Sequence, residues 1–317
     1  MPTLGGKIKK SKMVKFKGLS DLGVIIRTEQ DCIDFFESAI WKGKPISPFD
    51  PTSKVYKCAN NQYRCKNTGK YFNIRTNTIF ENSKLSLGKW LWAMALFSSH
   101  KKGVSSYQLA KYINITQKSA WFVLHRLRLV FKQPGLGTIL LENSVEIDET
   151  FIGGKNKNRH WNKKVPNSQG RSWKDKVPVL GMLERGGNLI TQVVSNTQQN
   201  TLEQIIKNNI KKGSNIYTDE WYRHSNLSKS FNHQIVNHSA KEYVNKMAHT
   251  NSIENFWSHL KRGVYGTYHW VSKKHLHSYI DEFTLRYNTR KHGEQDRLDL
   301  VLSLVVGKRL TYQQLIS

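Results

Sequence analysis

The sequence is poor in cysteine and has no long hydrophobic run. Its 317 residues include only 3 cysteines, too few for the disulfide framework of a small secreted scaffold. No stretch approaches the roughly 18 consecutive apolar residues of a membrane-spanning helix. Residues 1–17 also lack the apolar core of a secretory signal peptide. These absences predict a cytoplasmic protein with no membrane partner.

Acidic residues are also scarce. There are 23 Asp and Glu against 50 Lys and Arg, a formal net charge of +27. The segment 82–141 contains nine basic residues and no acid, whereas a solvated helix face normally mixes the two signs. Hydrophobic residues make up 38% and aromatic residues 11%, which is enough for packed cores. The charge therefore predicts a folded, nucleoid-associated protein whose main partner is double-stranded DNA.

The first half of the chain contains short elements behind a basic arm. The arm holds six lysines between Lys7 and Lys17. Apolar residues at helical spacing predict a helix over 22–41, and short alternating runs at 55–58, 63–65 and 71–75 predict a small β meander. Ser83 is the expected cap of the helix that follows.

A helix-turn-helix is predicted within the acid-free segment. Helical stretches at 105–112 and 117–131 flank a turn at 114–116, and Thr116 is a plausible N-cap of the second helix. In such motifs the start of the second helix enters the major groove. We therefore expect DNA contacts from this helix, although any helical hairpin has a similar pattern. The expected contacts are Gln117, Lys118, Ser119 and Arg126.

The second half reads as an α/β domain. Strands are predicted at 144–152, 177–183, 189–194, 215–218 and 233–236, and helices at 201–212 and 249–264. This order matches a ribonuclease-H-like layout, in which carboxylates come from a central strand, a neighbouring strand end and a late helix. The Asn- and Lys-rich segment 155–176 is expected to be a mobile loop insertion.

Three acids stand at those places. Asp148 lies within the first strand, Asp219 directly after the fourth, and Glu254 on the late helix. Converging carboxylates suit two Mg²⁺ or Mn²⁺ ions, which prefer oxygen ligands. Lys261, two turns after Glu254, could contact a DNA phosphate. The alternative is that each acid pairs with one of the surplus basic residues, and spacing alone does not exclude it.

Longer motifs carry a resemblance. Residues 145–155 (VEIDETFIGGK), 217–220 (YTDE) and 249–263 (HTNSIENFWSHLKRG) are similar to the DDE transposases of bacterial insertion sequences related to the eukaryotic Merlin elements. Residues 103–110 (GVSSYQLA), 116–121 (TQKSAW) and 265–269 (YGTYH) continue the similarity. It extends from about Tyr56 to Asn288.

The resemblance implies a ribonuclease-H-like catalytic domain behind a DNA-binding region. It makes Asp148 and Asp219 the first two metal ligands, Glu254 the third, and Lys261 the lysine that completes a tetrad. Because the family varies at the third position, Asn251 and Asn255 remain alternatives to Glu254. The implied regions are a basic arm (1–20), an N-terminal helix and ribbon-like region (21–82), a helix-turn-helix region (83–134), a catalytic domain (140–290) and a C-terminal tail (291–317).

One feature departs from that family, which usually carries a zinc ribbon with two Cys-x-x-Cys pairs. Ser47 and Asp50 stand where the first pair would fall, and Thr68 replaces the second cysteine after Cys65. The remaining thiols of Cys58 and Cys65 cannot close a tetrahedral zinc site. A degenerate ribbon without structural zinc is therefore expected, and Cys32 is expected to be a core residue.

The sequence thus predicts a DNA transposase that binds the terminal inverted repeats of an insertion sequence and catalyses metal-dependent strand cleavage and strand transfer. Pairing of two DNA ends implies a homodimer or higher oligomer on DNA. Two alternatives remain at this stage. One is a catalytically inactive DNA-binding regulator, and the other is a ribonuclease-H-like nuclease without strand transfer.

Overall fold

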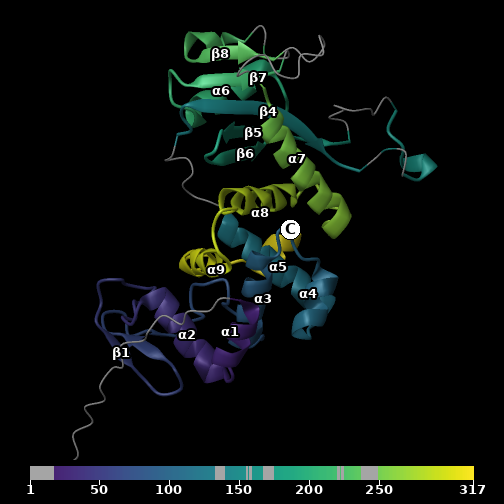
Figure 1. The fold of residues 1–317 in the computed structure, drawn as a ribbon. Coiled ribbons are helices and arrows are strands. Elements are labelled where there is room, and N and C mark those ends of the chain that lie inside the picture. Colours follow the sequence, from purple (N-terminus) through teal and green to yellow (C-terminus); the bar gives the residue numbers. More distant parts are fainter. Residues whose placement is uncertain are drawn as a thin grey trace, which may run out of the picture. The chain divides into compact units, whose positions relative to one another are not determined.

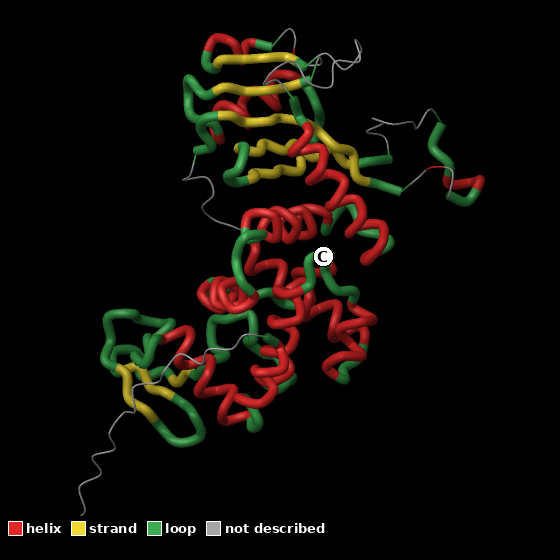
Figure 2. The backbone as a smooth tube through the Cα atoms, viewed as in Figure 1, coloured by secondary structure: helices red, strands yellow, loops and turns green. Residues whose placement is uncertain are grey.

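The computed structural model describes residues 18–132, 140–154, 156, 159–166, 175–219, 222, 225–236 and 249–317. They divide into two compact units (Figures 1 and 2). Unit 1 contains the described residues up to His100, together with 106–130 and 292–317; unit 2 contains 101–105 and the described residues of 131–291. The basic arm up to residue 17 and half of the predicted loop 155–176 lie outside the described residues.

Two helices replace the single one predicted at the start of unit 1. They are α1 (Leu19–Ile25) and α2 (Glu29–Trp41). The break is set by Thr28, whose hydroxyl accepts from the backbone N–H of Asp31 at 3.1 Å, while its own N–H donates to the Asp31 carboxylate at 2.8 Å. This reciprocal capping box starts a new helix, which a reading of apolar periodicity alone does not detect.

The predicted meander is present. Strands β1 (Val55–Lys57), β2 (Tyr63–Cys65) and β3 (Tyr71–Phe72) form an antiparallel sheet in the order β1-β2-β3. Its small core joins the buried side chains of Tyr63, Cys65 and Phe72 to Trp41 of α2. Cys32 is buried in α2, as expected.

Helices α3 (Leu87–Ser99), α4 (Ser106–Ile113) and α5 (Gln117–Phe131) follow. The cap of α3 is Ser86, whose hydroxyl accepts from Lys89 N–H, and not Ser83 as predicted. Ser83 instead accepts a hydrogen bond from the indole of Trp90 at 3.0 Å. Thr116 caps α5 as predicted, since its Oγ1 accepts from the Ser119 N–H at 3.2 Å.

The expected tail 291–317 is part of unit 1 from His292 onward. They form α9 (Glu294–Ser303) and the short α10 (Tyr312–Ile316). Helix α9 packs against α2 and α3, and Val306 bridges to Thr78. The buried residues Leu298, Val301 and Leu302 explain why: α9 has an apolar face that must be covered.

Unit 2 is a mixed α/β domain. Its strands are β4 (Ser144–Ile152), β5 (Val177–Glu184), β6 (Leu189–Val193), β7 (Asn215–Thr218) and β8 (Asn232–Ile235). They form one sheet in the order β6-β5-β4-β7-β8 (Figure 1). Strands β5 and β6 run antiparallel to their neighbours, whereas β7 and β8 continue the sheet in parallel with β4. All five strands were predicted within two residues of these bounds.

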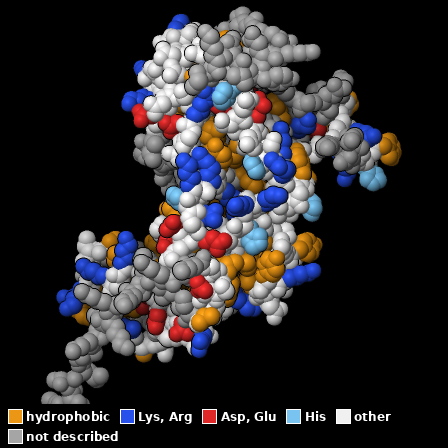
Figure 3. All heavy atoms as spheres, viewed as in Figure 1, with side chains coloured by type: hydrophobic (Ala, Val, Ile, Leu, Met, Phe, Trp, Pro, Cys, Tyr) orange, Lys and Arg blue, Asp and Glu red, His pale blue; other side chains and the backbone are white. Residues whose placement is uncertain are grey.

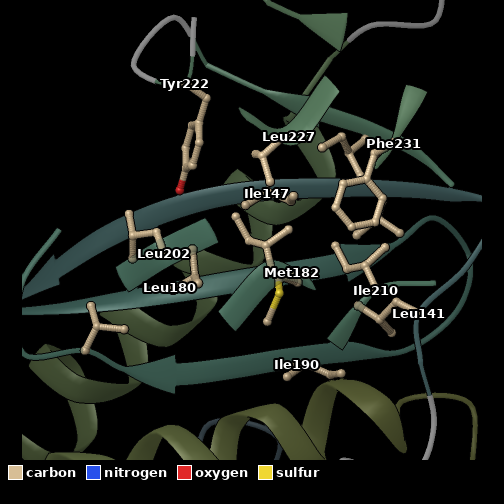
Figure 4. Close-up of a cluster of buried hydrophobic side chains, with 14 residues drawn as sticks. Leu141, Ile147, Leu180, Met182, Ile190, Leu202, Ile210, Tyr222, Leu227 and Phe231 are labelled. Carbon is tan, nitrogen blue, oxygen red and sulfur yellow. The ribbon is translucent and has the colours of Figure 1, made fainter. Parts of the chain in front are cut away.

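Helices cover both faces of this sheet. Helix α6 (Gln199–Asn209) packs on one face in a core that includes Ile147, Met182 and Leu202 (Figure 4). Helices α7 (Asn251–Gly263) and α8 (Leu276–Asn288) build the core of the other face. The π-helix 264–268 follows α7, and 3-10 turns lie at 161–163 and 226–229. Because both faces are covered, β4 has buried positions on each side. Of its polar residues, Glu146 and Thr150 are buried, and Asp148 and Glu149 are half-buried.

In the described part of the chain, none of the helices is long and apolar enough to cross a membrane.

Candidate active site

The parallel register of two strands places Asp219 level with Asp148. Strand β7 pairs with β4 so that Ser144 faces Asn215, a difference of 71 positions. The same difference separates Asp148 from Asp219, which directly follows β7. Neighbouring strands lie roughly 4.8 Å apart, so Asp219, just past the end of β7, lies near Asp148 on β4. The strand pairing therefore brings together two of the predicted site residues.

Glu254 approaches from α7. The buried residues Ile253, Phe256, Trp257 and Leu260 turn one side of the helix toward the sheet, and Glu254 lies on the adjoining exposed side. Its carboxylate accepts a hydrogen bond of 3.0 Å from the hydroxyl of Thr250, which is buried. Glu254 is thus held by the residue immediately before α7.

The negative charges of Asp219 and Glu254 act on Asp148. Burial, followed by the negative charges of Asp219 and Glu254, raises the pKa of Asp148 to about 6, even though the hydrogen bonds that the carboxylate accepts lower it. A carboxylate in this setting is destabilised by desolvation and by its like-charged neighbours. Asp148, Asp219 and Glu254 therefore form an acidic group in which the charges of Asp219 and Glu254 act on Asp148.

Trp257 supports Asp148 directly. Its indole Nε1 donates to Asp148 Oδ2 at 3.0 Å. The ring lies over Gly181, the residue of β5 paired with Asp148, where any Cβ would come within 2.6 Å of the ring. The absence of a side chain at Gly181 thus makes room for the ring that holds Asp148. Sequence reasoning placed Trp257 in the core, where it is, but missed this role; its position three residues after Glu254 was the available signal.

The neighbouring acid Glu149 faces the opposite side of the sheet. Tyr222 is buried and donates its phenol hydrogen to Glu149 Oε1, and Figure 4 shows its hydroxyl pointing toward β4. Burial and the negative charge of Glu149, followed by those of Asp219 and Asp148, raise the pKa of Tyr222 well above its ordinary value. Tyr222 therefore remains protonated and acts as a donor beside the acidic group.

The donor set suits a hard divalent cation. Three carboxylates offer only oxygen atoms, the ligands that Mg²⁺ and Mn²⁺ prefer, and the charges of two of them, after burial, raise the pKa of the third, Asp148. Within the described ranges, however, no three His, Cys, Asp or Glu side chains are close enough to form a coordination shell. The residues fit Mg²⁺ or Mn²⁺ in chemistry, and their side chains have to close further around an ion to bind it.

The remaining predicted residues of this site lie along α7. Lys261 is half-buried, two turns after Glu254. Asn251 and Asn255 are both exposed.

The predicted DNA contacts on α5 have different settings within unit 1. Lys118 is exposed, and its ammonium lies 5.0 Å from the ring centroid of Tyr312. Ser119 is half-buried in the first turn. Gln117 ties α5 to α4, since its amide donates to Ser106 Oγ at 2.9 Å. In Figure 3, Lys and Arg side chains are spread over the visible surface, and hydrophobic groups reach it in places.

Arg126 does not fit the predicted role. Only 4% of it is exposed. Its guanidinium donates to the backbone carbonyls of Ile79 at 2.7 Å, Glu81 at 2.9 Å and Leu310 at 3.0 Å. Arg126 therefore holds separate segments of unit 1 together. This placement corrects the expectation that it contacts DNA; the sequence could not reveal it because the carbonyl partners come from distant positions.

In the region where a degenerate zinc ribbon is expected, hydroxyl groups make the hydrogen bonds around Cys65. Ser47 Oγ accepts from the backbone N–H groups of Phe49 and Asp50. Burial raises the pKa of the Cys65 thiol, but hydrogen bonds with Ser47, Ser53 and Thr68 outweigh it and lower the pKa to about 6. Ser47 and Thr68, the residues at two of the missing cysteine positions, thus lie together beside Cys65.

Comparison with known proteins identifies the family. The model of the ISXO2-like transposase domain matches residues 140–288, which lie in unit 2. An uncharacterized transposase-like protein of Haemophilus influenzae is 33% identical over 118 residues, which cover 93% of that protein and 37% of this chain. The chain belongs to the ISXO2-like transposase family. An uncharacterized protein in the transposable element ISH50 of Halobacterium salinarum is 27% identical over 244 residues, covering 81% of that protein and 74% of this chain.

This membership makes the chain a DNA transposase of an insertion sequence, as the sequence motifs predicted. Among solved structures, a pre-cleavage Mos1 transpososome matches with 12% identity and a TM-score of 0.29, covering 67% of this transposase and 77% of that chain. The Mos1 strand transfer complex matches with 14% identity and a TM-score of 0.25, covering 68% and 78%. These TM-scores are too low to establish a common fold.

Proposed function

We propose that this transposase cuts and joins DNA strands with a ribonuclease-H-like catalytic domain, unit 2, whose acids Asp148, Asp219 and Glu254 hold divalent metal. The observation that carries the proposal is the acidic group, in which β4 and β7 align the two aspartates and α7 supplies the glutamate. The sheet order, with three antiparallel strands followed by two parallel ones, supports the ribonuclease-H-like assignment.

The chain's own residues have defined tasks in this proposal. Asp148, Asp219 and Glu254 would hold the metal, and two Mg²⁺ or Mn²⁺ ions bound there would supply charge stabilisation for in-line phosphoryl transfer. Trp257 orients the Asp148 carboxylate by its hydrogen bond. Tyr222 keeps Glu149 turned to the opposite face. Lys261, on the same helix as Glu254, binds a phosphate beside the cleaved bond.

Unit 1 is proposed to bind the terminal inverted repeats. Helices α4 and α5 form a helical hairpin with a capped second helix, the arrangement that places the start of α5 in a major groove. Lys118 and Ser119 at that start are the proposed contacts, with Gln117 positioned by Ser106. Two DNA ends must be held together for transposition, so a homodimer or higher oligomer is proposed on DNA.

The test is cleavage of a duplex that carries the ends of the element, in Mg²⁺ or Mn²⁺, by the wild-type protein and Asp219→Asn. Metal-dependent nicking at the end boundary that the variant lacks is the expected result. Tight binding without nicking by either protein would instead leave a DNA-binding regulator. Nicking without joining of the freed 3′ end to a new duplex would leave a nuclease.

A further inference from the structure

Glu146 is a fully buried acid outside the proposed metal-binding group. It lies on β4 two residues before Asp148, and side chains two apart on a strand share a face of the sheet. Its exposed fraction is 0%. A carboxylate removed from water is costly unless hydrogen bonds and positive charge surround it. The contacts of Glu146 therefore have to stabilise its buried carboxylate.

One oxygen of Glu146 caps a helix from another element. Oε2 accepts from the backbone N–H groups of Ser252 at 2.9 Å and Ile253 at 3.0 Å, in the first turn of α7. The residue before α7, Thr250, makes no side-chain cap to that backbone; its hydroxyl donates to Glu254 instead. Glu146 thus satisfies donors that a helix start leaves open, and its charge faces the positive end of the helix dipole.

The other oxygen binds an arginine that connects three segments. Glu146 Oε1 accepts from Arg185 Nε at 2.8 Å. The same guanidinium donates to the backbone carbonyl of His249 at 2.7 Å and lies 4.0 Å from the ring centroid of Tyr217 on β7. The imidazole Nδ1 of His249 lies 3.3 Å from Glu146 Oε1. This network joins β4, β7 and the start of α7, the three elements that carry the proposed metal-binding acids.

We infer that Glu146, held by Arg185, is a positioning residue that fixes the first turn of α7 against β4 and so sets Glu254 beside Asp148. Glu254 is the residue after Ile253, whose backbone N–H binds Glu146. A shift of that turn moves Glu254 relative to a sheet that already fixes Asp148 and Asp219. The inference rests on the proposed function, since it assigns Glu254 to the metal.

The test compares Glu146→Gln with Glu203→Gln. In Glu146→Gln, the side chain keeps its size, but its amide nitrogen must face either the α7 backbone donors or the Arg185 donor. Glu203 is a matched control because it is also a buried acid of unit 2, caps Asn226 N–H at 2.9 Å and pairs with Lys207 at 3.2 Å, within the α6 side of the domain. Both variants lose a buried charge, but only one contacts α7.

Two readouts separate positioning from general destabilisation. Hydrogen exchange of peptides covering 250–257, without metal, should be faster in Glu146→Gln and unchanged in Glu203→Gln. The Mn²⁺ concentration that half-saturates binding, measured by electron paramagnetic resonance, should rise about tenfold in Glu146→Gln only, the size typical for loss of a residue that orients a metal ligand. If Glu146→Gln does not fold, Arg185→Lys takes its place. Lysine keeps the positive charge but loses the hydrogen bond that the Arg185 guanidinium donates to the His249 carbonyl.

Unchanged exchange in 250–257 together with wild-type Mn²⁺ affinity in Glu146→Gln overturns the inference. Equal changes in both variants also overturn it, since a general loss of stability then explains them. Failure of the proposed function gives a different result: the wild-type protein neither binds Mn²⁺ at Asp219 nor nicks DNA, while the exchange measurement still reports on the Glu146 contact.

Discussion

The indole of Trp257 on α7 donates a 3.0 Å hydrogen bond to the carboxylate of Asp148 on β4. This bond lowers the pKa of Asp148, opposing burial and the charges of Asp219 and Glu254. Trp257 lies one turn after Glu254 on α7. This helix therefore supplies the Glu254 carboxylate and also the donor that orients the Asp148 carboxylate. Packing of α7 on the sheet therefore sets two features of the site at once.

Trp257→Phe removes the donor while keeping an aromatic ring. A hydrogen bond to a charged group contributes roughly 1.5–3 kcal/mol, so the pKa of Asp148 should rise, and the acidic limb of the pH–cleavage profile should move upward by about one pH unit. The measurement is the cleavage rate between pH 5 and 9. Trp90→Phe is the control, since Trp90 is also buried and donates to Ser83; an equal displacement there would contradict the prediction.

Asp148→Asn should stabilise the protein when no divalent metal is present. The pKa of Asp148 is raised to about 6 in the folded state, so between about pH 4 and 6 the folded protein keeps a proton that the unfolded chain loses. Stability therefore falls as the pH rises through this window, and the full penalty, on the order of 2 kcal/mol, is present above it. Asparagine removes the charge and still accepts from Trp257.

Thermal unfolding in chelator at pH 4.5 and pH 7.5 measures this effect. The variant should melt a few degrees above wild type at pH 7.5 and by a smaller margin at pH 4.5. Glu142→Gln, which removes an exposed ion pair with Lys211, should change little at either pH. A variant less stable than wild type at pH 7.5 would show that Asp148 is not destabilising there.

Lys118→Ala should weaken DNA binding through loss of a phosphate contact. Lys118 is exposed at the first turn of α5, and each neutralised phosphate contributes about one to the slope of log affinity against log salt. The slope should fall by about one, and the melting temperature should stay unchanged. Fluorescence anisotropy at several salt concentrations measures the slope, and thermal unfolding measures the melting temperature. The control is Lys211→Ala, since Lys211 is exposed on unit 2. An unaltered slope in Lys118→Ala would show that Lys118 makes no phosphate contact.

Three substitutions should restore zinc binding to the ribbon-like region. The combined variant carries Ser47→Cys, Asp50→Cys and Thr68→Cys. Together with Cys65, it has four thiols in this region. The two segments already meet, since Asn67 Nδ2 donates to Asp50 Oδ2 at 2.7 Å and Asn67 N–H to Ser53 Oγ at 3.0 Å. We expect one Zn²⁺ per chain by elemental analysis after dialysis. Adding Cys65→Ser should abolish it; retention of zinc without Cys65 would place the metal elsewhere.

The sequence by itself determined the elements of unit 2 and the acids they carry. Strands β4 and β7 have the bounds that apolar alternation predicted, and Thr116 caps α5 as its hydroxyl suggested. These features depend on neighbours within a few positions, so local pattern reveals them. The long motifs, in turn, predicted the transposase family that the comparisons show.

Only the tertiary structure decided which partners distant residues meet. The burial of Arg126 depends on the backbone carbonyls of Ile79, Glu81 and Leu310. Helix α9, near the C-terminus, is folded into unit 1 because α2 and α3 cover its apolar face. The roles of Trp257 and Glu146 likewise depend on α7 packing over β4. Such contacts join positions tens to hundreds of residues apart, and their energies come from burial and hydrogen bonding that no local spacing records.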